Sequence, residues 1–386
     1  MNKSKRIFAA CRDMGAAGAL IPVLQKLKNN DHEVTVYARQ GDPARAIFEE
    51  SGLALADHEG GESTDESIFD LLSVIHPNVV LTGIGTEKDG VEKDLLRVAK
   101  ELRIPTAVVF ETWPHHWLQN YGERDRPLYR TAARTFVPDV PSAQLLDDAG
   151  WNPACVVASG SPTHEKLLSD LLPKREQLRK EFRDRFLIGT NDTVILWPMN
   201  LDIDDPSIYD AGHPELNGVP EPVLLETILQ GVQSLRRRGV ENVRLIIRRK
   251  PTHPERVLRG LCDQYADARA MIDAMPGAGA PAAAMFGADL VMGTGGTTML
   301  AQAALCGIPA AHVTVGSQRD PKSVITNAIG LTYALWAPRV EILGDFIQSF
   351  AVNAPGMIEQ LKPKFNGASA MGAARRIASE VMRIAS

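Results

Sequence analysis

A glycine-rich stretch in the second half of the chain has the composition of a phosphate-binding turn. Segment 288–309, ADLVMGTGGTTMLAQAALCGIP, runs from an apolar stretch through the glycines into a helical pattern. The turn consists of Gly293, Thr294, Gly295, Gly296, Thr297 and Thr298. Glycines let a ligand approach the backbone closely, and the first N–H groups of a helix lack internal partners and carry partial positive charge. The segment predicts a phosphate site at a helix N-terminus, with a ligand-free structural turn as the alternative.

Further side chains near this turn could bind the rest of a nucleotide. Thr297 and Thr298 can cap the helix or donate their hydroxyls to a phosphate, and Gln302, one turn after Thr298, could reach a ribose hydroxyl. Lys250 and His253 lie in the sequence KPTHPE, which follows a predicted strand. The basic stretch that ends at Lys250 could neutralise a leaving diphosphate, or it could be a solvated strand end. His253 could contact the same ligand or cap the next helix.

The first half of the chain carries acids and aromatic residues directly after apolar runs. Asp13 follows RIFAAC, and Glu111 follows TAVVF and begins the sequence ETWPHHW. Aromatic faces suit sugar rings, and histidine suits proton transfer near neutral pH. The predicted catalytic residues are Asp13 (the first choice for the base), Glu111 and His116, and the predicted acceptor-binding residues are Gly15, Gly18, Trp113 and His115. A capping role for Asp13 and a packed loop around the histidines are the alternatives.

The motif content argues against several classes of cofactor chemistry. No H-E-x-x-H motif or Cys/His cluster has the spacing of metal ligands. The dinucleotide fingerprint G-x-G-x-x-G is absent, since the turn after Gly293 lacks its final glycine. Walker-type lysine motifs, nucleophile elbows and kinase motifs are absent as well. We therefore expect no metal and no cofactor, with any bound nucleotide being part of a substrate.

The composition indicates an ordinary globular protein with two domains. The chain has 386 residues, of which 44% are hydrophobic and 23% charged, and its net charge is −5. This length exceeds that of a typical domain with a single hydrophobic core. The negative net charge argues against nucleic-acid binding. The apolar runs are too short to span a bilayer, and the four scattered cysteines suit a reducing compartment, so we expect a cytoplasmic protein. Both a monomer and an oligomer remain open.

Strand-like and helical patterns alternate in both halves, which predicts two parallel sheets covered by helices. We expect a first domain at 1–170, a second at 187–365 and a C-terminal helix at 366–386 that crosses back to the first. The charged segment 167–186 is interpreted as a helical connector, and segment 12–18 as a loop. Basic residues near the C-terminus could contact lipids weakly. They are Lys362, Lys364, Arg375, Arg376 and Arg383.

Three segments resemble motifs of the glycosyltransferase-B (GT-B) enzymes and of the related non-hydrolysing UDP-N-acetylglucosamine 2-epimerases. Segment 288–309 is similar to their donor-binding region, with an apolar strand, a glycine turn, a helix and a closing Gly-x-Pro. ACVVASGSP at 154–162 is similar to the end of their N-terminal domain, and KPTHPE resembles their His-Pro region. The resemblance implies an α/β GT-B fold, in which two Rossmann-like, doubly wound domains face each other across a cleft.

The chain departs from these families at three positions. A glutamate of the donor helix often binds the ribose in them, where this chain has Gln302. The loop GGTGGH of the lipid-linked N-acetylglucosaminyltransferases matches MGAAGA here, so Ala19 replaces its histidine. The epimerases carry a histidine after the first strand of the second domain, where this chain continues from Trp197 with Pro198.

The resemblance implies a metal-independent glycosyltransferase that moves a sugar from a nucleotide-sugar donor, most simply a UDP-sugar, to an acceptor. The first domain would hold the acceptor, and the helix after residues 293–296 would hold the leaving diphosphate. A 2-epimerase of the UDP-N-acetylglucosamine type and a polyol-phosphate transferase are the enzymatic alternatives. A module that binds a nucleotide or glycan without turnover is the third, because the family's glutamate and histidine are replaced.

Overall fold

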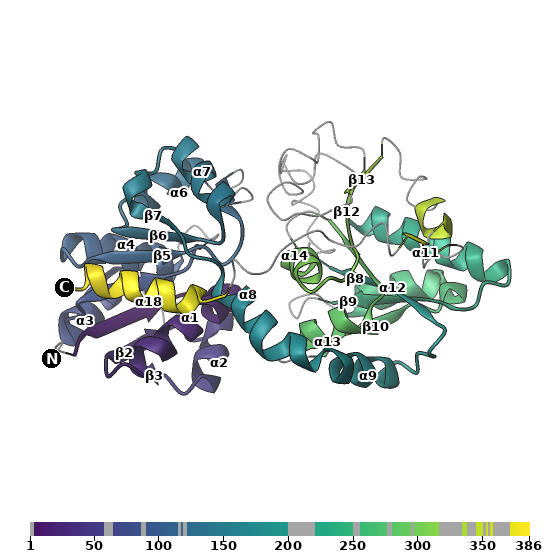
Figure 1. Cartoon of the computed structure of the whole chain (residues 1–386), viewed down its shortest axis with the longest axis horizontal. Coiled ribbons are helices and arrows are strands. Elements are labelled where there is room, and N and C mark those ends of the chain that lie inside the picture. The colour runs from purple at the N-terminus through teal and green to yellow at the C-terminus, as the bar shows by residue number, and fades with distance from the viewer. Residues whose placement is uncertain are drawn as a thin grey trace. The chain divides into compact units, whose positions relative to one another are not determined.

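The described part of the chain forms two compact units. The computed structural model describes residues 4–57, 65–85, 90–114, 117–118, 122–199, 221–249, 255–275, 280–294, 297–315, 334–337, 345–349, 353, 356–357 and 371–386. The first unit comprises Met1–Lys166 and Ala368–Ser386, and the second comprises Leu167–Gly367. Figure 1 shows that each unit is built around a sheet with helices packed beside it. The chain therefore leaves the first unit once and returns to it at the C-terminus.

The first unit contains a seven-stranded sheet in the order β3-β2-β1-β4-β5-β6-β7, and every neighbouring pair is parallel. Its strands are β1 (Arg6–Ala10), β2 (Glu33–Tyr37), β3 (Ala54–Leu55), β4 (Val79–Thr82), β5 (Thr106–Val109), β6 (Arg134–Val137) and β7 (Val156–Ala158). The strand order reverses between β1 and β4. Open α/β sheets bind ligands at the carboxyl ends of the strands at such a switch point.

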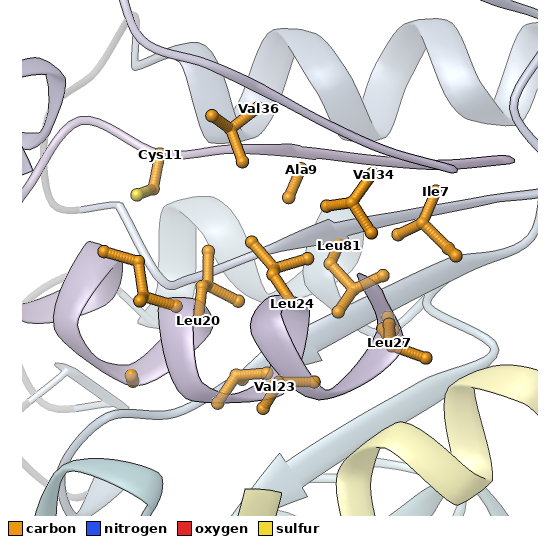
Figure 2. Close-up of a cluster of buried hydrophobic side chains, with 14 of the residues drawn as sticks. Ile7, Ala9, Cys11, Leu20, Val23, Leu24, Leu27, Val34, Val36 and Leu81 are labelled. Carbon is orange, nitrogen blue, oxygen red and sulfur yellow. The ribbon is translucent and has the colours of Figure 1, made fainter. Parts of the chain in front are cut away.

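Helices surround this sheet on both faces. They are α1 (Met14–Lys28), α2 (Pro43–Glu50), α3 (Asp65–Ile75), α4 (Val91–Glu101), α6 (Gly122–Tyr129), α7 (Val140–Asp148), α8 (Pro162–Lys166) and α18 (Ala373–Ile384), with a 3-10 turn at Pro153–Cys155. The apolar face of α1 packs against β1, β2 and β4 in one buried cluster. Figure 2 labels Leu20, Val23, Leu24 and Leu27 of the helix and Ile7, Ala9, Val34, Val36 and Leu81 of the strands.

The loop expected at residues 12–18 is wrong, because α1 already begins at Met14. The carbonyl of Asp13 accepts the N–H of Ala17 at 3.0 Å, which closes the first helical turn. A Cβ atom on Gly83, just after β4, would lie 2.5 Å from the Cβ of Ala16. The glycines and alanines that suggested a flexible loop instead let the helix approach the strand ends closely.

The second unit repeats the architecture with six parallel strands in the order β10-β9-β8-β11-β12-β13. The strands are β8 (Thr193–Pro198), β9 (Val243–Arg248), β10 (Met271–Asp273), β11 (Leu290–Gly293), β12 (Ala310–Val315) and β13 (Ala334–Ala337). The helices are α9 (Arg175–Arg185), α11 (Glu221–Arg237), α12 (Glu255–Gln264), α13 (Ala280–Gly287) and α14 (Thr298–Leu305). Short helical turns occupy Leu167–Leu171, Leu172–Lys174 and Ala266–Ala268. No described helix of either unit is long and apolar enough to cross a membrane.

The charged segment expected as a connector contains α9, which is an integral helix of the second unit. Arg179 donates to the carbonyls of Phe286 (3.0 Å) and Ala288 (3.1 Å) at the end of α13, where a helix leaves its last carbonyls without partners. Phe182 packs so closely on α13 that a Cβ atom on Gly287 would lie 2.1 Å from its ring. The charges of α9 therefore stabilise a contact between two helices rather than a solvated spacer.

Helix α18 is attached to the first unit by hydrogen bonds as well as by its apolar face. The carboxylate of Glu165, on α8, accepts the N–H groups of Gly372 (2.7 Å) and Ala374 (2.9 Å) at the start of α18. Arg376 donates to the carbonyl of Ser159 at 2.8 Å. Buried side chains of α18, among them Ile377, join the cluster that contains α1. The C-terminal helix thus completes the core of the first unit.

Glu165→Ala should weaken the attachment of α18. The variant loses an acidic cap that satisfies two N–H groups, a change that costs about 1–2 kcal/mol. Hydrogen-exchange mass spectrometry of the full chain should show the amides of α18 exchanging about 5–30-fold faster. Glu101→Ala, on the exposed end of α4, is the control. Equal effects of both variants on α18 would contradict the capping role.

Candidate functional site

Acidic residues of the first unit meet at the carboxyl edge of its sheet. Asp13 follows β1, Glu111 follows β5, and Glu92 lies in the first turn of α4, which follows β4. These three strands are parallel neighbours, so their carboxyl ends share one edge. Burial raises the pKa of Glu111, and the charges of Asp13 and Glu92 raise it further. The three carboxyl groups therefore form one electrostatically coupled cluster.

The carboxyl group of Glu111 lies against the N-terminus of α1. A Cβ atom on Gly15, in the first turn of α1, would be 2.6 Å from Oε1 of Glu111, so only a glycine leaves room for the carboxyl there. Its Oε2 atom is enclosed and has no hydrogen-bond partner among the described residues. Burial is the main cause that raises the pKa of Glu111 to about 8. The group is protonated near neutral pH, yet it faces a helix end that favours its ionised form, which suits reversible proton transfer.

Asp13, the predicted base, is the residue that precedes α1. Its backbone is extended (φ −89°, ψ 146°), and its side chain makes no hydrogen bond to the first turn of the helix. The side chain is 38% exposed, and its Oδ1 lies 4.0 Å from Nη1 of Arg12. The structure therefore does not show the capping role that was the alternative for this residue. It brings Asp13 to the same edge as Glu111, with its carboxylate partly open to solvent.

Glu92 is the acid of this cluster that the sequence analysis missed. Its side chain is fully buried, and its Oε1 accepts the N–H of Arg12 at 2.7 Å. Burial raises the pKa of Glu92, while the hydrogen bond from Arg12 opposes that shift. A glutamate in the first turn of a helix normally indicates a solvated end that faces the helix dipole. The signal that could have identified it is its position in the first turn of the helix that follows the central strand β4.

The whole first turn of α4 carries buried charges. Lys93 forms an ion pair with Asp125 of α6 at 2.8 Å, and both side chains are buried. Burial acts to raise the pKa of Asp125, but hydrogen bonds from Arg124 and Lys93 outweigh it and hold that pKa below its usual range. Asp94 pairs with Arg39, which follows β2. Helix α4 therefore connects the segments that follow several strands of the sheet.

Trp113, a predicted acceptor-binding residue, lies inside the first unit with 4% of its surface exposed. Its Nε1 donates to Oδ2 of Asp139 at 2.7 Å, and its ring centroid is 5.3 Å from that of His164. Burial lowers the pKa of His164 to about 4, so this imidazole is neutral. Ser161 donates to the carbonyl of Glu111 at 3.3 Å. Trp113 is therefore packed within the first unit, and its ring offers no open face to an acceptor.

The other residues predicted for the first unit fall into two groups. Gly15 and Gly18 lie in the first two turns of α1, and only Gly15 is close to an acid, since a Cβ atom on Gly18 would meet nothing within 4 Å. His115 and His116 lie outside the described residues. The structure thus brings together Asp13, Gly15 and Glu111 out of the residues predicted here.

In the second unit, the predicted phosphate turn joins β11 to the N-terminus of α14. Thr297 precedes α14 in an extended conformation (φ −74°, ψ 118°) and makes no side-chain hydrogen bond to its first turn. The Oγ1 atom of Thr294 is enclosed and has no hydrogen-bond partner within the described part of the chain. Thr298 is the exposed first residue of α14, and Gln302 lies one turn further on. This helix end has hydroxyl and N–H donors that suit an anion.

Four residues predicted to bind the nucleotide, Lys250, His253, Gly295 and Gly296, lie outside the described residues. Gly293 ends β11, where a Cβ atom would be 3.2 Å from Cγ2 of Thr297. One arginine of the basic stretch before Lys250 makes its contacts within the second unit. Arg248 is buried, forms an ion pair with Asp273 and donates to the carbonyl of Met275 at 3.2 Å. Its charge is therefore already balanced inside the second unit.

The architecture matches solved structures of GT-B proteins. No protein-family model and no curated protein matches the sequence. The UDP-GlcNAc 2-epimerase from Neisseria meningitidis bound to UDP-GlcNAc is 14% identical, with a TM-score of 0.68 over 98% of this chain and 99% of that chain. MnaA of S. aureus in complex with UDP is 14% identical (TM-score 0.70; 98% and 96% covered), as is MurG of Acinetobacter baumannii (TM-score 0.54; 98% and 99% covered). The chain has the GT-B fold, which confirms the expectation from the sequence.

Glu111→Gln should change how stability depends on pH. The pKa of Glu111 rises from 4.5 to about 8 on folding, chiefly through burial, so the folded state binds this proton more tightly and loses stability as the pH rises between these values. The glutamine cannot ionise. Thermal unfolding should therefore show equal stability near pH 4 and a more stable variant above pH 8, by on the order of 4 kcal/mol. The exposed Asp147→Asn is the control, and a difference that does not vary with pH would contradict the raised pKa.

Proposed function

We propose that this chain is an enzyme that acts on a nucleotide-activated sugar and uses Glu111 for proton transfer. The observation that carries the proposal is the enclosed carboxyl of Glu111 beside Gly15, with a pKa raised to about 8 by burial and by the charges of Asp13 and Glu92. An unpaired buried polar atom costs free energy that an apolar residue would avoid. Acid–base catalysts are placed in such surroundings because a pKa near the working pH favours proton exchange.

The N-terminus of α14 supports the nucleotide part of this proposal. The enclosed Oγ1 of Thr294 and the uncapped first turn of α14 leave donors for the oxygens of a diphosphate. The similar epimerase from Neisseria meningitidis was solved with UDP-GlcNAc, and S. aureus MnaA with UDP. A UDP-sugar is therefore the substrate class that we propose for this chain. The reaction would need no cofactor, as the absence of cofactor motifs in the sequence indicated.

Among reactions of a UDP-sugar, epimerisation of the sugar ring fits the acids of the first unit best. Epimerisation removes a proton from one face of a ring carbon and returns one to the other face, so it needs an acid and a base near each other. Glu111 is protonated near neutral pH, and Asp13 stands at the same sheet edge with a partly exposed carboxylate. We assign the acid to Glu111 and the base to Asp13, with the roles exchanged in the reverse reaction.

Transfer of the sugar to an acceptor is the second candidate function. The observation that favours it is the 38% exposure of the Asp13 side chain at the start of α1. A carboxylate in that position could take the proton of an acceptor hydroxyl as the sugar is transferred. Both candidates have a diphosphate that α14 would stabilise, and they differ in whether a second substrate is needed.

Proton NMR of the full chain incubated with UDP-GlcNAc and other UDP-sugars in D2O separates the two candidates. Epimerisation should give a new anomeric signal and exchange of the inverted C–H for C–D without any acceptor. Transfer should release UDP only when an acceptor sugar or lipid is added. Calorimetric titration with UDP on the same preparation measures nucleotide binding. Binding without any turnover would favour the non-catalytic module, and no binding of UDP or any UDP-sugar would refute the proposal.

Gly15→Ala should impair turnover without unfolding the chain. The new methyl group would stand 2.6 Å from Oε1 of Glu111, so the carboxyl must move, while alanine itself favours the helix. We expect kcat to fall by about tenfold or more, the effect of misplacing an acid–base group, with the melting temperature unchanged or raised. Gly18→Ala is the matched control, since its Cβ would meet nothing within 4 Å. Similar kinetics of the two variants would show that the Glu111 carboxyl is not required where it stands.

A further inference from the structure

Glu92 is a buried acid that the proposed reaction does not use directly. Its side chain has no exposed surface, so it cannot meet a substrate in this structure. Glutamate is among the residues least often buried, because taking its charge out of water is costly unless a partner compensates. The contacts of its two carboxylate oxygens show what this residue does.

The Oε1 atom of Glu92 holds the turn that leads into α1. It accepts the N–H of Arg12 at 2.7 Å, and Arg12 lies between the end of β1 and the start of α1. The next residue, Asp13, immediately precedes the helix, and its carbonyl accepts the N–H of Ala17 at 3.0 Å. This hydrogen bond, together with the one that the Arg12 carbonyl accepts from the N–H of Ala44 at 2.9 Å, holds the backbone immediately before the predicted base and before the helix end that faces Glu111.

The Oε2 atom of Glu92 is enclosed on the side of the chain that follows β4. A Cβ atom on Gly85 would lie 2.8 Å from this oxygen and 3.4 Å from Oη of Tyr129. The N–H of Gly85 donates to that same Oη at 2.8 Å, and Nε1 of Trp117 donates to the Gly85 carbonyl at 3.2 Å. Oε2 has no hydrogen-bond partner among the described residues. A buried acceptor without a partner costs free energy, and a purely structural role for Glu92 would leave that cost uncompensated.

We propose that Glu92 is a positioning residue: through the N–H of Arg12 it sets the turn between β1 and α1, and thereby holds Asp13 and the N-terminus of α1 in place against Glu111. This inference rests on the proposed function only in its consequence for turnover. The position of the turn itself can be measured without a substrate.

Glu92 also acts on Glu111 through its charge. The hydrogen bond from Arg12 favours the ionised form of Glu92, whereas Oε2 of Glu111 has no donor among the described residues, so Glu92 ionises first. Its charge then adds to that of Asp13 in keeping the proton on Glu111. Among the described residues, the other titratable groups that face this cluster are Arg12, Asp42, the thiol of Cys11 and the phenol of Tyr129. Burial raises the pKa of both Cys11 and Tyr129, and the charge of Glu92 raises it further.

Two substitutions separate the hydrogen bond from the charge. Glu92→Gln keeps an oxygen that can accept the N–H of Arg12 but removes the charge, and Glu92→Leu removes both. Amide hydrogen exchange of Arg12 reports the turn, and carbon-13 NMR of the Glu111 carboxyl, assigned with Glu111→Gln, reports its titration. Steady-state kinetics over a range of pH report the consequence for turnover. Glu101→Gln, at the exposed end of α4, is the control.

In Glu92→Gln we expect Arg12 exchange as slow as in the parent chain, the pKa of Glu111 lowered by about one unit, and a kinetic pH profile displaced in the same direction. In Glu92→Leu we expect Arg12 to exchange at least about tenfold faster, the loss of one hydrogen bond. Its kcat should fall by a similar factor while KM changes little. Recovery of kcat by Gln but not by Leu is the signature of positioning.

The inference is overturned if Arg12 exchanges equally slowly in Glu92→Leu, or if Gln and Leu reduce kcat alike while Arg12 stays protected in Gln. If Glu92→Leu does not fold, Glu92→Asp replaces it, since the shorter side chain keeps the charge but withdraws from the N–H of Arg12. Arg12 exchange should then rise with the Glu111 titration unchanged. If no UDP-sugar is turned over, the proposed function fails, and Arg12 exchange with the Glu111 titration still decides the positioning role.

Discussion

Three consecutive charged residues buried at the start of α4 determine the arrangement of the carboxyl edge of the first unit. Glu92 accepts the N–H of Arg12, Lys93 pairs with Asp125, and Asp94 pairs with Arg39. A buried charge is costly unless it is paired, and removing one partner costs more than the pair contributes. Each partnered segment therefore has one favourable position once α4 has packed on the sheet. These contacts help to hold the segments after β1 and β2 and helix α6 against α4.

The chemistry of the candidate site follows from that arrangement. Because the strands are parallel neighbours, Asp13 and Glu111 lie at one edge, and Glu92 is close enough for its charge to raise the pKa of Glu111. Like charges at short range cannot all ionise together, so the acid with the fewest hydrogen bonds keeps its proton longest. That acid is Glu111, and Gly15 leaves room for its carboxyl beside a helix end that favours the ionised form. Burial and the neighbouring acids keep the proton on Glu111, whereas the helix end favours its release, so this carboxyl can both hold and release a proton.

The second unit has the same architecture but a different distribution of charge. Its arginines are mostly paired within the unit: Arg179 with Asp289 and the end of α13, and Arg248 with Asp273. At the start of α14, by contrast, Thr297 makes no side-chain hydrogen bond to the first turn, and the hydroxyl of Thr294 has no partner among the described residues. One unit thus gathers acids suited to proton transfer, and the other offers neutral donors suited to an anion. The same fold can carry different chemistry in each unit because the residues after the strands differ.

The two sheets, the flanking elements β11 and α14, and the positions of Asp13 and Glu111 after strands could be predicted from the sequence, because apolar periodicity and strand ends are local signals. The sequence did not determine that segment 12–18 is helical, since glycine and alanine read as flexible until the neighbouring strands pack against them. It missed Glu92 because a charged first turn normally faces water, and only the fold brings α4 over the end of β1. It assigned Trp113 to a ligand, whereas packing with His164 buries the ring. Burial and proximity between distant segments are properties of the tertiary structure, and they decide which acid keeps its proton.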